Sequence, residues 1–290
     1  MIKAAWIGLG AMGHPMASYL SRHPEVISLC VYNRTTAKAE QWLKDNNGTK
    51  ARSAKEAAMG ATLVFSCVGN DEDLIEITSG EEGAFHNMEP GCIFIDHSTT
   101  SADVARTQAE LADAKNIAYL DAPVTGGQKG AENGTLSVMA GGHAGALERV
   151  EPFMQAYAKE IRHMGPTGHG QLTKMVNQIA IAGLVEGLAE ALNFAKKAGL
   201  NIDDVIEVLS KGAAQSWQME NSGKSMANGD FDHGFAVDWM RKDLDICLKE
   251  ARKQDAPLPI TQMVEGYFAD LQAMNGGRWD ITSLIKRLEE

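Results

Sequence analysis

A glycine-rich hexapeptide near the N-terminus has the spacing of a dinucleotide-binding turn. Gly8-Leu9-Gly10-Ala11-Met12-Gly13 forms a GxGxxG pattern directly after the apolar run Ala4–Gly8. The first glycine of such a turn permits the sharp bend, the second lets the backbone approach a pyrophosphate, and the third lets helix and strand pack closely. The N-terminus of the next helix then offers N–H groups and a partial positive charge to the phosphates. A lone GxGxxG also fits a plain strand-to-helix turn, but its position between a strand and a helix favours the dinucleotide.

The end of the second apolar run bears on which dinucleotide is bound. NAD sites place an Asp or Glu there, which accepts a hydrogen bond from the ribose 2′-hydroxyl. This chain has Asn33 at that point, followed by Arg34 and Thr35. A guanidinium suits a 2′-phosphate by its charge and its fork of donors, so we expect NADPH to be preferred over NADH. The alternative is that Arg34 is an ordinary solvated residue at a helix start.

Two further segments carry groups that could bind and transform a small acid. Thr125-Gly126-Gly127 follows a predicted strand, and its hydroxyl and backbone N–H groups could bind a carboxylate, although a plain loop fits as well. Lys174 and Asn177 stand three residues apart in a predicted helix, so they share one face. A lysine acts as an acid or base when burial or nearby positive charge lowers its pKa. The alternative for Lys174 is an exposed helix lysine.

The elements that position these residues follow from the hydrophobic pattern. Short apolar runs alternate with helix-like segments from residue 3 to about 163, which predicts an α/β fold with a parallel sheet. The expected strands are 4–8, 27–32, 62–68, 92–96, 117–121, 136–140 and 161–164. The expected helices between them are 12–21, 36–46, 54–60, 71–79, 102–114 and 144–157.

The pattern changes after Gly170 to helical segments alone. Residues 172–199 contain no proline and are apolar on every side over 179–185, which predicts a long buried helix. Further helices are expected over 202–211, 238–254, 260–274 and 281–288. We therefore expect a doubly wound Rossmann-type domain over residues 1–164 and an all-helical domain over residues 165–290, which would carry substrate contacts and dimerisation.

Composition narrows the class of protein. The 290 residues are 44% hydrophobic and 22% charged, a globular composition that excludes a disordered chain. A net charge of -11 argues against nucleic-acid and anionic-membrane partners. No uninterrupted apolar run has membrane length, and the N-terminus does not resemble a signal peptide, so we expect a cytoplasmic protein. The four cysteines form no CxxC pair and the eight histidines show no metal-ligand spacing, so no metal is expected.

In combination, these motifs resemble the β-hydroxyacid dehydrogenase family, which includes 3-hydroxyisobutyrate dehydrogenases and tartronate semialdehyde reductases. The resemblance covers essentially the whole chain and rests on GLGAMGHPMA, DAPVTGG, GHGQLTKMVNQ and the segment from Phe235 to Leu244. It implies a Rossmann-type domain, an all-α domain and a cleft between them. This chain departs from the usual family pattern at Thr125, where serine is common, and at Gln178, where asparagine is frequent.

The resemblance also implies roles for matching residues. Lys174 matches the catalytic lysine, and Asn177 and Gln178 match the polar pair one turn further along the helix. The substrate carboxylate would be held by Thr125, Gly126 and Gly127. The implied cofactor contacts beyond the glycine turn and the strand end at 33–35 are Val68, Gly69, Thr99 and Lys242.

The expected reaction is reversible hydride transfer between a nicotinamide and the carbinol carbon of a small β-hydroxy acid. Lys174 would be the general acid or base, and Asn177 would hold it in register with the substrate. The same architecture occurs in imine reductases, in 6-phosphogluconate-type decarboxylating enzymes and in non-catalytic NADP-binding modules. The presence of Lys174 disfavours imine reductases and non-catalytic modules, and the short chain disfavours the decarboxylating enzymes. An all-apolar helix also favours a homodimer or homotetramer.

Overall fold

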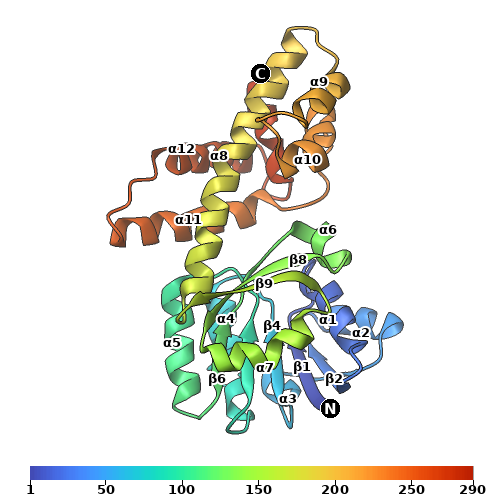
Figure 1. Ribbon diagram of the computed structural model, residues 1–290, viewed down its shortest axis with the longest axis vertical. Coiled ribbons are helices and arrows are strands. Elements are labelled where there is room, and N and C mark those ends of the chain that lie inside the picture. Colours follow the sequence, from blue (N-terminus) through green and yellow to red (C-terminus); the bar gives the residue numbers. More distant parts are fainter. Residues whose placement is uncertain (290) are drawn as a thin grey trace. The chain divides into compact units, whose positions relative to one another are not determined.

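The computed structural model describes residues 1–289 in two compact units (Figure 1), Met1–Lys174 and a second unit that begins at Met175. The first ends ten residues beyond the boundary expected from the pattern of strands. The ten additional residues are the end of the last strand and the start of a long helix. The backbone at this helix start is hydrogen-bonded to Asp121 of the same unit.

A nine-stranded sheet forms the centre of the first unit, in the order β3-β2-β1-β4-β5-β6-β8-β7, with β9 paired to β8. The order from β3 to β6 is that of a doubly wound dinucleotide-binding fold. The strands are β1 (Ile2–Ile7), β2 (Val26–Tyr32), β3 (Thr49–Lys50), β4 (Leu63–Ser66), β5 (Ile93–Asp96), β6 (Ala118–Asp121), β7 (Val124–Thr125), β8 (Leu136–Gly142) and β9 (Ala158–Gly165). The predicted α/β fold is thus confirmed.

The sheet differs from the expected parallel arrangement at β8. This strand runs antiparallel to both β6 and β7, while the other pairings in the sheet are parallel. The connection from β6 to β8 holds only β7 and the short helix α6 (Gly127–Glu132). Because a parallel return needs a long crossover, this compact connection brings β8 back in the opposite direction.

Helices cover both faces of the sheet (Figure 1). Successive apolar side chains of β1 point to opposite faces, so each face must be covered. Ala4 and Trp6 point into one core, and Ala5 and Ile7 into the other. The first core is covered by α1 (Gly13–Ser21), α2 (Thr36–Asp45), α6 and α7 (Ala144–Met154). The second is covered by α3 (Ala54–Ala57), α4 (Asp71–Thr78), η1 (Ala84–His86) and α5 (Ala102–Asp113). Both faces of the strands are therefore buried, which explains their continuous apolar runs.

The second unit is helical. Its elements are most of α8 (His169–Lys197), then α9 (Ile202–Leu209), α10 (Trp217–Asn228), α11 (Val237–Lys253), α12 (Pro259–Ala273) and the 3₁₀ helix η2 (Ile281–Leu288). Helix α10 was not predicted because its sequence is mixed and polar, although Ser216 caps its start and Gly229 ends it with φ 73°. Among the described residues no strand follows β9, in agreement with the prediction.

The length and hydropathy of helix α8 are comparable to those of a membrane-spanning helix. One 18-residue window in it has a mean hydropathy of 1.3, so by length and composition it is the one described helix that could span a membrane. The expectation from uninterrupted apolar runs missed this window, because polar residues interrupt it. In the structure, 44% of the window is buried, and Ala182, Val185 and Leu188 belong to the core of the second unit. A central helix of a helical unit has the same signature as a span.

Candidate active site

The glycine turn after β1 has the stereochemistry expected of a phosphate-binding turn. Gly8 has φ 95°, and a Cβ there would overlap the Cys67 carbonyl; a Cβ at Gly13 would overlap the Gly8 carbonyl. At Gly10, by contrast, an added Cβ meets no atom within 4 Å. The backbone is thus tightly packed at the first and third glycines and open at the second, which is where a pyrophosphate would lie. This cradle fits the predicted dinucleotide.

The end of β2 is bonded to the glycine turn through Asn33 and carries the exposed cation of Arg34. The Leu9 backbone N–H donates to Asn33 Oδ1 (2.8 Å), and Asn33 Nδ2 donates to the Thr35 carbonyl (3.0 Å). Asn33 therefore ties the glycine turn to the end of β2. The side chain of Arg34 is 71% exposed and forms an ion pair with Asp73. An arginine paired only at the surface can exchange this partner for a phosphate.

Two more loops leave the sheet at the same edge, after β4 and after β5. The Val68 N–H donates to Ser98 Oγ (2.8 Å), and Ser98 Oγ donates to Asp96 Oδ1 (2.6 Å). Asp96 also accepts from Ser66 Oγ and is fully buried, and this burial raises its pKa. The loop of Val68 and Gly69 is thus joined to the loop of Thr99.

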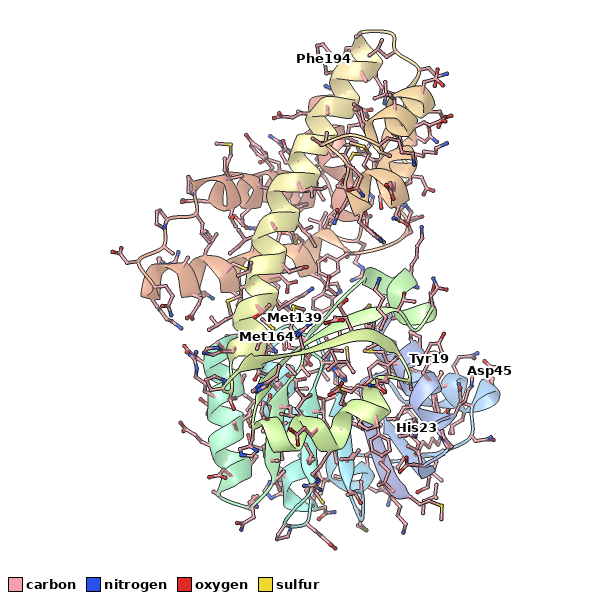
Figure 2. All side chains as sticks on the ribbon, viewed as in Figure 1. Tyr19, His23, Asp45, Met139, Met164 and Phe194 are labelled. Atoms are coloured by element: carbon pink, nitrogen blue, oxygen red, sulfur yellow. The ribbon has the colours of Figure 1, made fainter. Side chains whose placement is uncertain are left out.

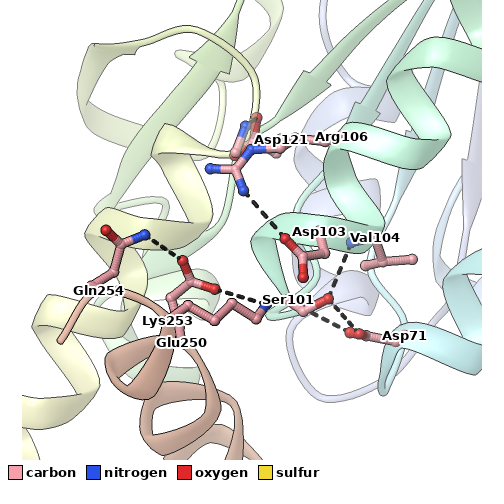
Figure 3. A network of polar contacts seen from close by, with 10 residues as sticks. Asp71, Ser101, Asp103, Val104, Arg106, Asp121, Glu250, Lys253 and Gln254 are labelled. Carbon is pink, nitrogen blue, oxygen red and sulfur yellow. Dashed lines mark hydrogen bonds and ion pairs between the residues drawn. The ribbon is translucent and has the colours of Figure 1, made fainter. Parts of the chain in front are cut away.

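A second link joins these loops one residue further out. Ser101 donates to Asp71 through its backbone N–H (2.8 Å) and its hydroxyl (2.6 Å). Its Oγ also accepts from the Val104 N–H and so caps α5 (Figure 3). The N-termini of α4 and α5 are therefore held together beside the loops expected to contact cofactor.

The predicted carboxylate loop lies between β7 and α6. Gly126 and Gly127 have φ 128° and 65°, and an added Cβ at Gly127 meets no atom within 4 Å. Thr125 pairs with Ser137 across the β7–β8 ladder, and this fixes the backbone that precedes the glycines. The loop has an ordered start and an accessible backbone, as an anion-binding loop requires.

Lys174 lies at the end of the first unit, in the second turn of α8, and is 9% exposed. The exposed-lysine alternative is therefore wrong. Asn177 follows three residues later on α8, within the second unit.

A polar chain in the second unit contains the remaining predicted residues. Asn177 Nδ2 donates to Gln178 Oε1 (2.7 Å), and Gln178 Nε2 donates to Asp243 Oδ2 (2.6 Å). Lys242 Nζ lies 2.9 Å from Asp243 Oδ1. Asp243 is 2% exposed and is the group that joins Lys242 to the Asn177–Gln178 pair. Its importance was missed, although the sequence places it beside Lys242.

Comparisons with known proteins identify the family. Residues 3–165 match the family model described as the NAD binding domain of 6-phosphogluconate dehydrogenase. Residues 168–288 match the model described as NAD-binding of NADP-dependent 3-hydroxyisobutyrate dehydrogenase. The chain belongs to the β-hydroxyacid dehydrogenase family. The resemblance stated from the motifs is thereby confirmed, and the protein is an NAD(P)-binding oxidoreductase.

Relatives of this dehydrogenase match it along nearly their whole length. An uncharacterized oxidoreductase of Shewanella frigidimarina is 55% identical over 100% of this chain and 99% of the relative. The 2-hydroxy-3-oxopropionate reductase of Escherichia coli is 32% identical over 99% and 97%. Among solved structures, a Mycobacterium tuberculosis 3-hydroxyisobutyrate dehydrogenase with L-serine superposes with a TM-score of 0.89 at 29% identity and full coverage of both chains.

A further carboxylate of the dehydrogenase, Asp121 at the end of β6, holds the start of α8. Asp121 Oδ1 accepts from the Gly168 N–H (2.8 Å) and Oδ2 from the Gln171 N–H (2.9 Å). Burial raises the pKa of Asp121 to about 6, assisted by the nearby Asp96 carboxylate and opposed by the backbone donors. In the sequence, Asp121 stands out only as the start of the DAPVTGG segment. Its position at a strand end, 47 residues before Gly168, was the available signal.

One histidine, His97, lies in a buried position directly after β5. His97 is buried, contacts the Ala122 carbonyl and the Tyr157 hydroxyl, and has its pKa lowered by burial to about 4. Within residues 1–289, no group of three or more His, Cys, Asp or Glu side chains is arranged to hold a metal ion. His97 is therefore a packing residue beneath the site.

Proposed function

We propose that this dehydrogenase uses NADP(H) to interconvert a small β-hydroxy acid and the corresponding semialdehyde, with Lys174 as general acid and base. One observation carries the proposal. The compact unit that contains the open glycine turn and the Thr125–Gly127 loop also contains a buried lysine, Lys174, at the start of α8. The glycine turn, the proposed carboxylate loop and the proposed acid–base lysine therefore belong to one structural unit, whereas Asn177, Gln178 and Lys242 belong to the second.

The cofactor assignment rests on Arg34. The backbone around Gly10 and the start of α1 would receive the pyrophosphate, and Arg34 with Thr35 would receive the 2′-phosphate. Val68, Gly69 and Thr99 would line the rest of the cofactor, and the family resemblance adds Lys242 as a further proposed contact. NADPH, when bound, supplies the hydride for reduction of the carbonyl carbon.

The substrate roles follow from the chemistry of the remaining groups. The Thr125 hydroxyl and the N–H groups of Gly126 and Gly127 would bind the carboxylate. In the reducing direction the Lys174 ammonium donates its proton to the substrate oxygen, and in the oxidising direction the neutral amine accepts that proton. Asn177 would hold the substrate oxygen in register with Lys174, with Gln178 fixing the Asn177 amide. Such acid–base assistance contributes roughly 10²–10⁴-fold.

The substrate class is a short acid with one carbonyl or carbinol. The substrates in the names of two similar proteins, 2-hydroxy-3-oxopropionate and 3-hydroxyisobutyrate, support this class. Thr125 carries a methyl group that a serine would lack, and this group would narrow the space around a bound carboxylate.

The test is NADPH consumption with a panel of small semialdehyde acids, repeated with NADH. Lys174→Ala is run alongside, with Lys197→Ala in the last turn of the same helix as the matched control. We expect turnover of at least one panel member, a loss of about 10²-fold or more in Lys174→Ala, and little change in Lys197→Ala. Near-normal turnover in Lys174→Ala would refute the role of Lys174. Tight NADPH binding without turnover of any member would favour an imine substrate or a non-catalytic role.

We further propose a cytoplasmic homodimer or homotetramer without nucleic-acid or membrane partners. The acidic net charge of -11 supports the last point. Large apolar side chains exposed on the second unit support assembly, and one of them is Phe194, near the C-terminal end of α8 (Figure 2). The exposed set comprises Val176, Leu184, Phe194, Leu200, Val208, Leu209, Trp217, Trp239, Ile260 and Met263.

A further inference from the structure

We propose that Gln171 is a positioning residue, which couples the loop after β5 to the part of α8 that carries Lys174. The inference rests on the proposed function, because it assigns Gln171 a role in placing the proposed acid and base.

Both ends of the side-chain amide of Gln171 form hydrogen bonds with the loop after β5. Gln171 Nε2 donates to the Ser98 carbonyl (2.8 Å), and Gln171 Oε1 accepts from the Thr100 N–H (3.1 Å). These two contacts bracket Thr99, the expected cofactor contact. Gln171 is completely buried, so no water competes for either end of the amide. Lys174 follows three residues later and lies near the same face of α8.

The bracketed loop is itself part of a wider network at the edge of the sheet. Ser98 Oγ receives the Val68 N–H and donates to the buried Asp96, and Ser101 donates twice to Asp71. A displacement of either loop therefore disturbs the other. The side-chain contacts of Gln171 join this loop network to α8.

The backbone of α8 is anchored at the same place. The Gln171 N–H donates to Asp121 Oδ2, and the Gly168 N–H donates to Asp121 Oδ1. A Cβ at Gly170 would overlap the carbonyls of Asp121 and Met139, so the helix start lies directly against the end of β6 and the middle of β8. Asp121 thus fixes where α8 begins, and the Gln171 side chain fixes how it is turned relative to the loop of Thr99.

The first experiment compares Gln171→Met with Gln108→Met. Methionine keeps the length and volume of glutamine but removes the hydrogen bonds. Gln108 is the matched control because it is also buried in the first unit, on α5, where its Oε1 accepts from Thr78 Oγ1 (2.8 Å) away from the site. Misplacement of a catalytic group by about 1 Å costs up to roughly 10²-fold in rate. We expect Gln171→Met to lower kcat by about 10–100-fold, to raise the KM for NADPH by less than about fivefold and to increase the primary isotope effect with C4-deuterated NADPH.

The second experiment needs no turnover. Amide hydrogen exchange over residues 168–176 is measured with and without NADPH. We expect NADPH to slow exchange of this segment in the native protein and in Gln108→Met, and to leave it unchanged in Gln171→Met. Protection of residues 8–14 by NADPH should persist in all three proteins, which shows that each still binds the cofactor.

The outcomes separate the two proposals. Equal kcat, isotope effect and NADPH protection in Gln171→Met and Gln108→Met would overturn the coupling while leaving the proposed function intact. A second outcome is that NADPH protects residues 168–176 in the native protein and in Gln108→Met but not in Gln171→Met, while the native protein reduces no member of the panel. This result would support the coupling and refute the proposed reaction. A native protein that binds neither NADPH nor NADH would overturn both.

Discussion

Arg34 Nη1 lies 2.6 Å from Asp73 Oδ1, at the exposed edge where the 2′-phosphate of NADPH is expected. The Arg34 side chain is 71% exposed, so the pair is a surface ion pair of small net stability. A phosphate offers a stronger, charge-assisted contact to the same guanidinium. We therefore expect Arg34→Ala to raise the Kd for NADPH by about 10–100-fold and to change the Kd for NADH by less than about threefold.

Fluorescence titration with both cofactors measures this difference. Arg52→Ala is the matched control, because Arg52 is an exposed arginine of the same unit, paired with Glu56. Asp73→Asn should have the opposite effect and tighten NADPH binding, since it removes both a competitor for Arg34 and a repulsive charge. Similar Kd values for NADPH and NADH in the native protein would contradict the assignment.

Asp121 should make stability depend on pH. Its folded pKa of about 6 lies above the ordinary value of 3.8, so the folded state holds this proton where the unfolded chain has lost it. The contribution is therefore full below about pH 4 and is lost as the pH rises through about 6, with a total of roughly 3 kcal/mol. Asp121→Asn removes this titration, so the stability difference between native protein and variant should shrink as the pH rises.

Urea unfolding at several values between about pH 4 and pH 7 gives the measurement, with hydrogen exchange in β1 as the signal for the first unit. Asp113→Asn on α5 is an exposed control and should show no such trend. A pH-independent difference between the native protein and Asp121→Asn would show that the carboxylate titrates normally.

A single added methyl group should have opposite effects at two glycines of α8. At Gly170 a Cβ overlaps the carbonyls of Asp121 and Met139, so Gly170→Ala should destabilise the first unit by about 1–3 kcal/mol and lower kcat. At Gly187 an added Cβ meets no atom within 4 Å, so Gly187→Ala should stabilise the helix by about 1 kcal/mol. Thermal melts and turnover of the two variants test this, and equal effects would contradict the close approach at Gly170.

The proposed assembly predicts a solution mass of two or four times 31.2 kDa. Phe194→Glu places a charge on the exposed apolar side of α8 and should shift the mass toward smaller species. Met59→Glu, at a 67% exposed apolar residue of the first unit, is the control and should leave the mass unchanged. Light scattering at micromolar concentration measures all three proteins, and a monomeric native protein would refute the assembly.

The sequence predicted best those features whose causes are local. Gly8, Gly10 and Gly13 lie within one turn, so their spacing between a strand and a helix predicted the close packing that the structure shows at Gly8 and Gly13. The alternation of apolar runs likewise placed the parallel strands. Asn33 was expected to contact the cofactor, which stays a prediction, and its contacts with Leu9 and Thr35 show that it holds the turn together.

Features that depend on distant partners could not be read in this way. Gln171 bonds to residues 71 and 73 positions earlier in the chain, and Gln178 bonds to Asp243, 65 positions later. No local pattern distinguishes these amides from ordinary helix glutamines. The antiparallel β8 was missed for a similar reason, because strand direction is set by the path of the connection.

The division of the molecule inside α8 has a consequence for its dissection. Lys174 is the last residue of the first unit, and the polar pair Asn177–Gln178 belongs to the second, although one uninterrupted helix carries them all. A fragment cut where the strands end would keep the nucleotide turn but lose both the lysine and the helix start that Asp121 anchors. The two halves of this enzyme are therefore poor modules for recombination, because residues proposed for the chemistry belong to both units.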